Sequence, residues 1–244
     1  MSATSIIYKR ELGAYLRSPL GWIVTSILLL VDGILFQSQA LSRSALSAAV
    51  LSYFFHLTAI VTMVAALAIS IRLIADERQN NSMVLLNTSP VRDSQIILGK
   101  FFAALTFLAF FLLLTLYLPL LIKVNGKISW AQIWVGYAGL LLLGAASLAV
   151  GLFASSLAKH QLIALVIGAA ILAVMALLYP LSQRLDAPLA TTVAQLDIFR
   201  MWLPQSITSF KDGVLAIKDV VYYVALTYFF LLLSMKTLEA KRWQ

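Results

Sequence analysis

Six stretches of about twenty mostly apolar residues restrict the fold of this chain more than any other feature of its sequence. A helix of about twenty residues crosses the hydrocarbon core of a bilayer, and a helix satisfies its own backbone polar groups there. The stretches cover residues 22–41, 49–72, 100–122, 133–157, 161–180 and 220–238. They predict an all-α integral membrane protein with six transmembrane helices, formed by one domain over residues 1–244.

The composition excludes a soluble enzyme. Hydrophobic residues make up 61% of the 244 residues and charged residues 11%, whereas roughly a quarter of an ordinary soluble domain is charged. The chain has no cysteine, which excludes disulfides and a cysteine nucleophile. The net charge of +8 comes mostly from residues at the ends of apolar stretches. We therefore expect lipid headgroups as the partner of these charges, and no nucleic acid.

Three segments outside the six stretches carry structure of their own. Residues 4–19 form an amphipathic pattern that Pro19 ends, which predicts an interfacial helix. Residues 73–99 connect the second and third spans. Residues 181–219 precede the last span and mix charged with apolar side chains, which favours short amphipathic helices at the outer interface, with a solvated loop as the alternative.

The lysines and arginines near the span ends predict the orientation. Eleven of the 18 fall in segments on the same side as the N-terminus. Because basic residues accumulate on the cytoplasmic side, both termini are predicted to be cytoplasmic. The segment 73–99 is then cytoplasmic, and the segment 181–219 lies outside.

The cytoplasmic segment 73–99 contains the strongest candidate site. Three charged residues, Asp76, Glu77 and Arg78, end the second span. A short apolar helix follows a polar turn, and a proline ends that helix before the third span. The candidate residues are Glu77, Arg78, Ser82, Met83, Leu85, Leu86, Thr88 and Pro90. Such a helix either docks a partner at the cytoplasmic face or packs on its own bundle, and the pattern leaves both open.

This segment resembles the coupling region of ABC-2 type transporter permeases. The similarity lies in the acidic residue and arginine at the span end, in Leu85-Leu86, in Ser89-Pro90-Val91 and in Gly99-Lys100. The N-terminal helix and the six spans extend it over nearly the whole chain. The segment 210–223 and Arg242-Trp243 most resemble the gliding-motility-associated permease branch. The chain departs from the family in having no glycine before Ser82 and in having Val84 where an acidic residue is common.

The resemblance implies a permease subunit of an ATP-driven transporter in the bacterial inner membrane, acting as an exporter or in a motility or envelope complex. It implies cytoplasmic ATPase subunits that bind ATP and Mg, and a second permease copy or a related membrane subunit with an extracytoplasmic domain. This chain is expected to bind no cofactor and to be no enzyme. Its sequence has no phosphate-binding loop, since Phe101 follows Gly99-Lys100. The first, second and fifth spans are candidates for the cavity wall.

Two ionisable residues fall inside predicted spans. Counting about 1.5 Å per residue places Asp32 about 18 Å and His56 about 24 Å from the cytoplasmic surface. A buried ionisable residue in a membrane is a candidate functional site. An Asp32–His56 contact is therefore predicted, and it either lines the transport path or joins two helices. Such residues also suit an ion-coupled secondary carrier, which is the main alternative function, ahead of an anchor for an envelope machine and an intramembrane enzyme.

Small residues recur at every fourth position of the fourth span, at Ser147, Gly151 and Ser155. This spacing makes one helix face smooth enough for a neighbouring backbone to approach closely. We therefore expect helix packing at this face.

Overall fold

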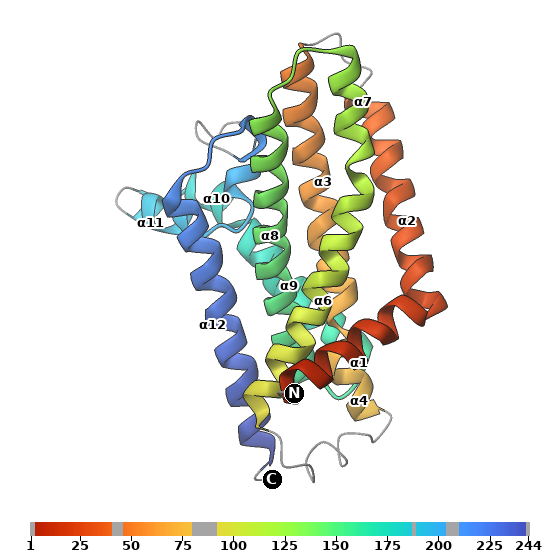
Figure 1. Ribbon diagram of the computed structural model, residues 1–244. Helices are drawn as coiled ribbons and strands as arrows, with labels where there is room; N and C mark the ends of the chain where they lie inside the picture. The colour runs from red at the N-terminus through yellow and green to blue at the C-terminus, as the bar shows by residue number, and fades with distance from the viewer. Residues whose placement is uncertain (1–2, 41–45, 80–91, 187–188, 204–209, 243–244) are drawn as a thin grey trace.

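The computed structural model describes residues 3–40, 46–79, 92–186, 189–203 and 210–242, and these residues form helices and connections without a strand. The long helices pack into one bundle (Figure 1). In chain order the elements are α1 (Ala3–Arg17), α2 (Pro19–Leu35), the π-helix η1 (Phe36–Ala40), α3 (Ser47–Ser70), α4 (Arg72–Gln79), α6 (Asp93–Thr115), α7 (Tyr117–Asn125), α8 (Trp130–Leu157), α9 (Gln161–Ala176), α10 (Leu178–Ser182), α11 (Leu189–Gln195), the 3-10 turns η2 (Arg200–Trp202) and η3 (Phe210–Asp212), and α12 (Ile217–Arg242). The all-α membrane fold is thus confirmed.

Five helical stretches of the described chain are long and apolar enough to cross a membrane. They cover Gly21–Ser38, Ser47–Gln79, Asp93–Val124, Trp130–Leu157 and Ile217–Ala240. The fifth predicted span is divided at Leu177 into α9, of 16 residues, and the short α10. At about 1.5 Å per residue, α9 is about 24 Å long, less than the roughly 30 Å hydrocarbon core. The first four predicted spans and the sixth are therefore long helices. That the fifth span crosses the membrane remains a prediction.

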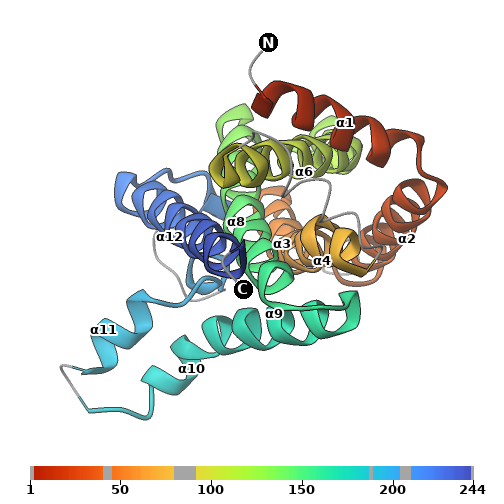
Figure 2. The ribbon, with the colours of Figure 1, turned by 90° about the horizontal axis from the view of Figure 1, so that it is seen from below.

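Helix α8 lies at the centre of the bundle, between α3, α6, α9 and α12 (Figure 2). Within the membrane-length windows, 72% of α8 is buried but only 22% of α2 and of α12. The small residues of α8 explain its position. A Cβ atom at Gly151 would overlap the Ser70 side chain of α3. The packing role predicted for this stripe is confirmed at Gly151.

Helix α1 crosses one end of the bundle and lies against α6 (Figures 1 and 2). Gly99 of α6 makes this close approach possible, because a Cβ atom there would be 2.9 Å from Cγ2 of Ile7. The Tyr15 ring stacks on Phe107 at 5.1 Å, and its hydroxyl donates to the Ile69 carbonyl. Pro19, predicted to stop the interfacial helix, is the first residue of α2. A backbone N–H at this position would have no acceptor within the helix, so a proline there loses no hydrogen bond.

Between α9 and α12, the short elements η2 and η3 pack against α3 and α8, away from α1 and α4. The predicted short helices of this segment are present as α11, η2 and η3. Their core is aromatic: Trp202 and Phe210 stack 6.0 Å apart, and the indole Nε1 of Trp202 donates to the Tyr223 hydroxyl. All three side chains are fully buried. This aromatic cluster, called the cap below, therefore packs over the first turns of α3 and α8.

Candidate functional site

Helix α4 continues α3 after a break at Ile71, and a serine of α8 causes the break. The Ser155 hydroxyl donates to the Ile71 carbonyl and accepts hydrogen bonds from the backbone N–H groups of Ile74 and Ala75. In an unbroken helix the Ala75 N–H would bond directly to the Ile71 carbonyl. Ser155 thus inserts into the helical hydrogen-bond ladder and satisfies the groups that it separates, a recognised cause of a helix kink.

Two further contacts fix α4 to the turn between α8 and α9. The Arg78 guanidinium donates to the Ala158 carbonyl, which caps the C-terminus of α8. The Gln161 amide at the start of α9 donates to Oδ1 of Asp76 at 2.7 Å. One face of α4 is therefore bound to α8 and α9 by polar side chains.

The other face of α4 enters a cluster of four charged residues, here called the ion-pair cluster: Arg10, Glu11, Glu77 and Lys100. The Lys100 ammonium lies 2.9 Å from Glu77 and 3.1 Å from Glu11. The Arg10 guanidinium lies 2.6 Å from Glu11 and 2.9 Å from Glu77. Only 1% of the Lys100 side chain is exposed. Two cations and two anions thus join α1, α4 and α6 at one point.

The electrostatics of the cluster favour its ionised state. Burial by itself raises the pKa of Glu11, but Lys100 and Arg10 outweigh burial and bring this pKa below its usual value. The hydrogen bond to Glu11 raises the pKa of Arg10, against the effect of burial. Burial raises the pKa of the Tyr15 hydroxyl, so it stays a neutral donor to Ile69 beside these charges. Because each buried charge has a partner of opposite sign, the cluster tolerates burial.

The structure locates two of the predicted coupling residues. Glu77 lies in the ion-pair cluster, and Arg78 binds the end of α8. The other six, Ser82, Met83, Leu85, Leu86, Thr88 and Pro90, lie outside the described residues. The cluster nevertheless brackets their segment, because α4 ends at Gln79 and α6 begins at Asp93.

The predicted Asp32–His56 contact is wrong. Oδ1 of Asp32 accepts a hydrogen bond from the Thr58 hydroxyl at 2.9 Å, and Nδ1 of His56 donates to the Trp202 carbonyl. Asp32 of α2 does lie beside α3, as the count of residues along the helices predicts, but that count does not give the direction of a side chain. His56 and Thr58 are two residues apart, so their side chains point about 200° apart around the axis of α3. Since Thr58 faces α2, His56 points to the cap instead.

Sequence reasoning missed most of the ion-pair cluster and the role of Ser155. Arg10, Glu11 and Lys100 are not among the predicted site residues, and Lys100 is named only in the family resemblance. A signal was present, because Lys100 begins the third apolar stretch with the nonpolar residues 96–99 before it, and an unpaired charge in such a place is costly. Among the described residues, no group of three or more histidines and acidic residues is placed to hold a metal ion.

The long apolar helices define a multi-pass membrane protein, and the ion-pair cluster joins three of its helices at one end of the bundle. The sequence model of the ABC-2 family transporter proteins matches residues 5–239. The chain therefore belongs to that family and is a membrane permease of an ABC transporter. In such transporters ATP is hydrolysed by separate nucleotide-binding subunits, so this chain is the transmembrane subunit and not the enzyme. No curated protein matches the chain.

Proposed function

We propose that this chain is the permease of an ATP-driven exporter in the bacterial inner membrane, with both termini in the cytoplasm. One observation supports the coupling mechanism: the ion-pair cluster joins α4, which precedes residues 80–91, to α6, which follows them, and to α1. A push on that segment by an ATPase subunit reaches α4 directly, and through Glu77 it reaches α1 and α6. Ser155 permits the movement, since it already satisfies the backbone at the break between α3 and α4.

The partners in this proposal are cytoplasmic ATPase subunits that bind ATP and Mg, and a second permease copy or a related membrane subunit with an extracytoplasmic domain. The same permease could instead belong to a gliding-type motility or envelope complex, because the family match does not distinguish the branches of the family. Family membership favours this mechanism over an ion-coupled carrier or a passive anchor. In it, Asp32 joins α2 to α3 through Thr58.

The test is purification of the tagged full chain from its native membrane in mild detergent, followed by identification of bound proteins by mass spectrometry. We expect a nucleotide-binding subunit with the wild type, and its loss from a Met83→Glu, Leu86→Glu double variant. A Glu77→Gln variant should retain the subunit but lower the ATPase rate of the complex, because Lys100 and Arg10 then lose one anion. Glu239→Gln is the matched control, since it removes an exposed ion pair on α12.

Two results would contradict this proposal. The absence of a nucleotide-binding subunit in several detergents would remove the ATP-driven mechanism for this chain. An unchanged ATPase rate in both Glu77→Gln and Glu11→Gln would remove the ion-pair cluster from the coupling path, although the docking role of residues 80–91 would stand.

A further inference from the structure

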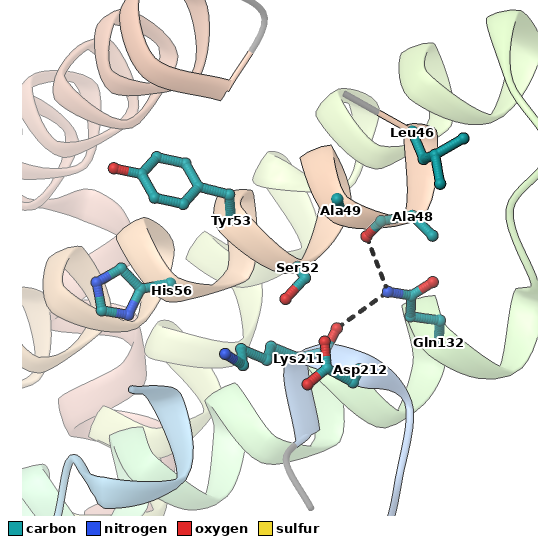
Figure 3. A pocket seen from close by; sticks show the side chains of 9 residues that line it. All are labelled: Leu46, Ala48, Ala49, Ser52, Tyr53, His56, Gln132, Lys211 and Asp212. Carbon is teal, nitrogen blue, oxygen red and sulfur yellow. Dashed lines mark hydrogen bonds between the residues drawn. The ribbon is translucent and has the colours of Figure 1, made fainter. Parts of the chain in front are cut away.

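A pocket of about 530 Å³ opens between the first turns of α3, the start of α8 and η3 (Figure 3). Helix α3 begins at the end of the bundle away from α1 and α4 (Figure 1). Three apolar residues at the beginning of α3 line one part of the pocket. The polar side chains that line it are those of Ser52, Tyr53, His56, Gln132, Lys211 and Asp212. In Figure 3, His56 and Gln132 lie at opposite ends of the pocket, with Ser52, Lys211 and Asp212 between them. The pocket takes no part in the coupling mechanism.

The walls of the pocket are fixed by hydrogen bonds from side chains to the main chain. Nε2 of Gln132 donates to the Ala48 carbonyl and to the Lys211 carbonyl, which joins the beginnings of α3 and α8 to η3. The turn continues through Gly213, whose φ of 82° suits glycine. A Cβ atom at Gly213 would lie 2.9 Å from Cα of Gln132. The pocket is therefore held in shape before any ligand arrives.

The pocket presents charges of both signs. The Lys211 ammonium donates to the Leu203 carbonyl, a neutral acceptor, so this bond does not cancel its charge. Burial lowers the pKa of Lys211, and the neighbouring Asp212 carboxylate opposes that effect. His56 also lines the pocket, and because a carbonyl only accepts hydrogen bonds, its Nδ1 carries the proton donated to the Trp202 carbonyl. The Ser52 hydroxyl adds a neutral donor and acceptor.

The pocket lies at the depth of a membrane interface. Helix α3 begins at Ser47, and His56 is nine residues further, about 14 Å along the axis. Trp130 and Trp134 at the start of α8 are 54% and 59% exposed, as is typical of the aromatic belt at headgroup level. The Lys123 ammonium lies 4.5 Å above the Trp130 ring.

We propose that this pocket binds a phosphoethanolamine group, which is a phosphate next to a primary amine, with Lys211 and the Ser52 hydroxyl on the phosphate and Asp212 on the amine. A simple anion is a poorer fit because Asp212 would repel it. A simple cation is a poorer fit because of Lys211. The chemistry is shared by a membrane lipid headgroup and by the free compound. The proposal does not depend on transport.

The experiment uses the full chain in nanodiscs made from lipids with phosphocholine headgroups, with a small fraction of a lipid carrying a phosphoethanolamine headgroup. Native mass spectrometry then counts the lipid retained after release. We expect the wild type to enrich the phosphoethanolamine lipid over the bulk lipid, because only a primary amine can donate to Asp212. Lys211→Gln and Asp212→Asn should each reduce that enrichment about tenfold, the effect of losing one hydrogen bond to a charged group.

Two comparisons separate a site from a general loss of structure. Lys218→Gln changes an exposed lysine of the same segment and should leave the enrichment unchanged. Asp212→Asn should keep or increase the retention of a lipid with an anionic phosphoglycerol headgroup, whereas Lys211→Gln should lower it. A variant with merely damaged folding would lose both lipids, and Ser52→Ala provides a milder change in the same pocket.

A parallel measurement adds free phosphoethanolamine to the detergent-solubilised chain and follows its thermal unfolding. Stabilisation by the free compound without enrichment of the lipid would identify a soluble ligand as the source. Enrichment of the lipid alone would identify the headgroup. Neither effect in the wild type, or equal enrichment in the wild type and both charge variants, would overturn the proposal.

Discussion

The two ends of the bundle hold their helices together in different ways. At the end with α1 and α4, side chains bind other side chains through charge, as Lys100 does with Glu11 and Glu77. At the end with η2 and η3, side chains bind main-chain groups and aromatic rings. There the carboxylate of Asp197 accepts from the N–H groups of Tyr179 and Phe199. In the part of the chain that the structure describes, the ion pairs between separate helices lie at the first of these ends.

The difference matches what each end is proposed to do. Ion pairs depend weakly on angle and can exchange partners within a cluster, so helices joined by them can shift without leaving a charge unpaired. A carboxylate bound to backbone N–H groups fixes the loop that carries it. We infer that the ion-paired end moves during coupling, while the capped end keeps a fixed shape around its pocket.

The largest expected effect is that of Lys100→Met. It removes the buried cation between two carboxylates, and breaking a buried pair costs roughly 3–5 kcal/mol because the remaining charge is left uncompensated. Thermal unfolding in detergent measures the loss. Adding Glu11→Gln and Glu77→Gln to the same variant should recover much of the stability. Failure of that triple variant to recover would mean that Lys100 acts by packing and not by charge.

At the capped end, Asp197→Asn should lower the free energy of unfolding by about 1–3 kcal/mol. The carboxylate accepts hydrogen bonds from two backbone N–H groups, whereas the asparagine amide nitrogen would face one of them and cannot accept. The same unfolding measurement applies, and the loss should be smaller than for Lys100→Met. A larger loss would reverse the comparison and make the cap the main source of stability.

Acidification should act on the two ends with opposite signs. The lowered pKa of Glu11 stabilises the folded chain above the usual glutamate pKa, and this contribution is lost as the pH falls through the folded value. Burial raises the pKa of Asp197 despite its N–H donors, so its ionised form is a penalty that disappears as the pH falls.

Differences between variants reveal these signs. With falling pH, the advantage of wild type over Glu11→Gln should shrink, while the stability of wild type relative to Asp197→Asn should improve. Unfolding curves between about pH 4 and pH 7, the range in which carboxyl groups titrate, provide the comparison. Parallel slopes for both variants would show that the two carboxyls do not differ in this way.

The smallest effect is expected for Glu239→Gln. Its partner Lys236 is 76% exposed and Glu239 is 53% exposed, and solvent screens such a pair. No measurable change in Tm should result. A clear destabilisation would show that ion pairs matter at this end of the molecule regardless of burial, and would weaken the special position of the cluster.

The sequence by itself determined the helices and the membrane. Apolar stretches of about twenty residues have few other stable solutions, so the long helices α3, α6, α8 and α12 could be predicted. The packing face of α8 could also be predicted, since its small residues repeat at helical spacing. The candidate coupling segment was found from charges and from Pro90 at a span end, and part of it lies outside the described residues.

Only the tertiary structure decided which polar side chains meet. Arg10 and Glu11 are neighbours in the sequence, but no local pattern brings them to Glu77 and Lys100. The Asp32–His56 prediction failed for the same reason, because depth along a helix follows from counting residues, whereas the direction of a side chain depends on how neighbouring helices are rotated. Ser155 shows this most clearly, since its role exists only because α8 places its hydroxyl inside the backbone hydrogen bonds of another helix.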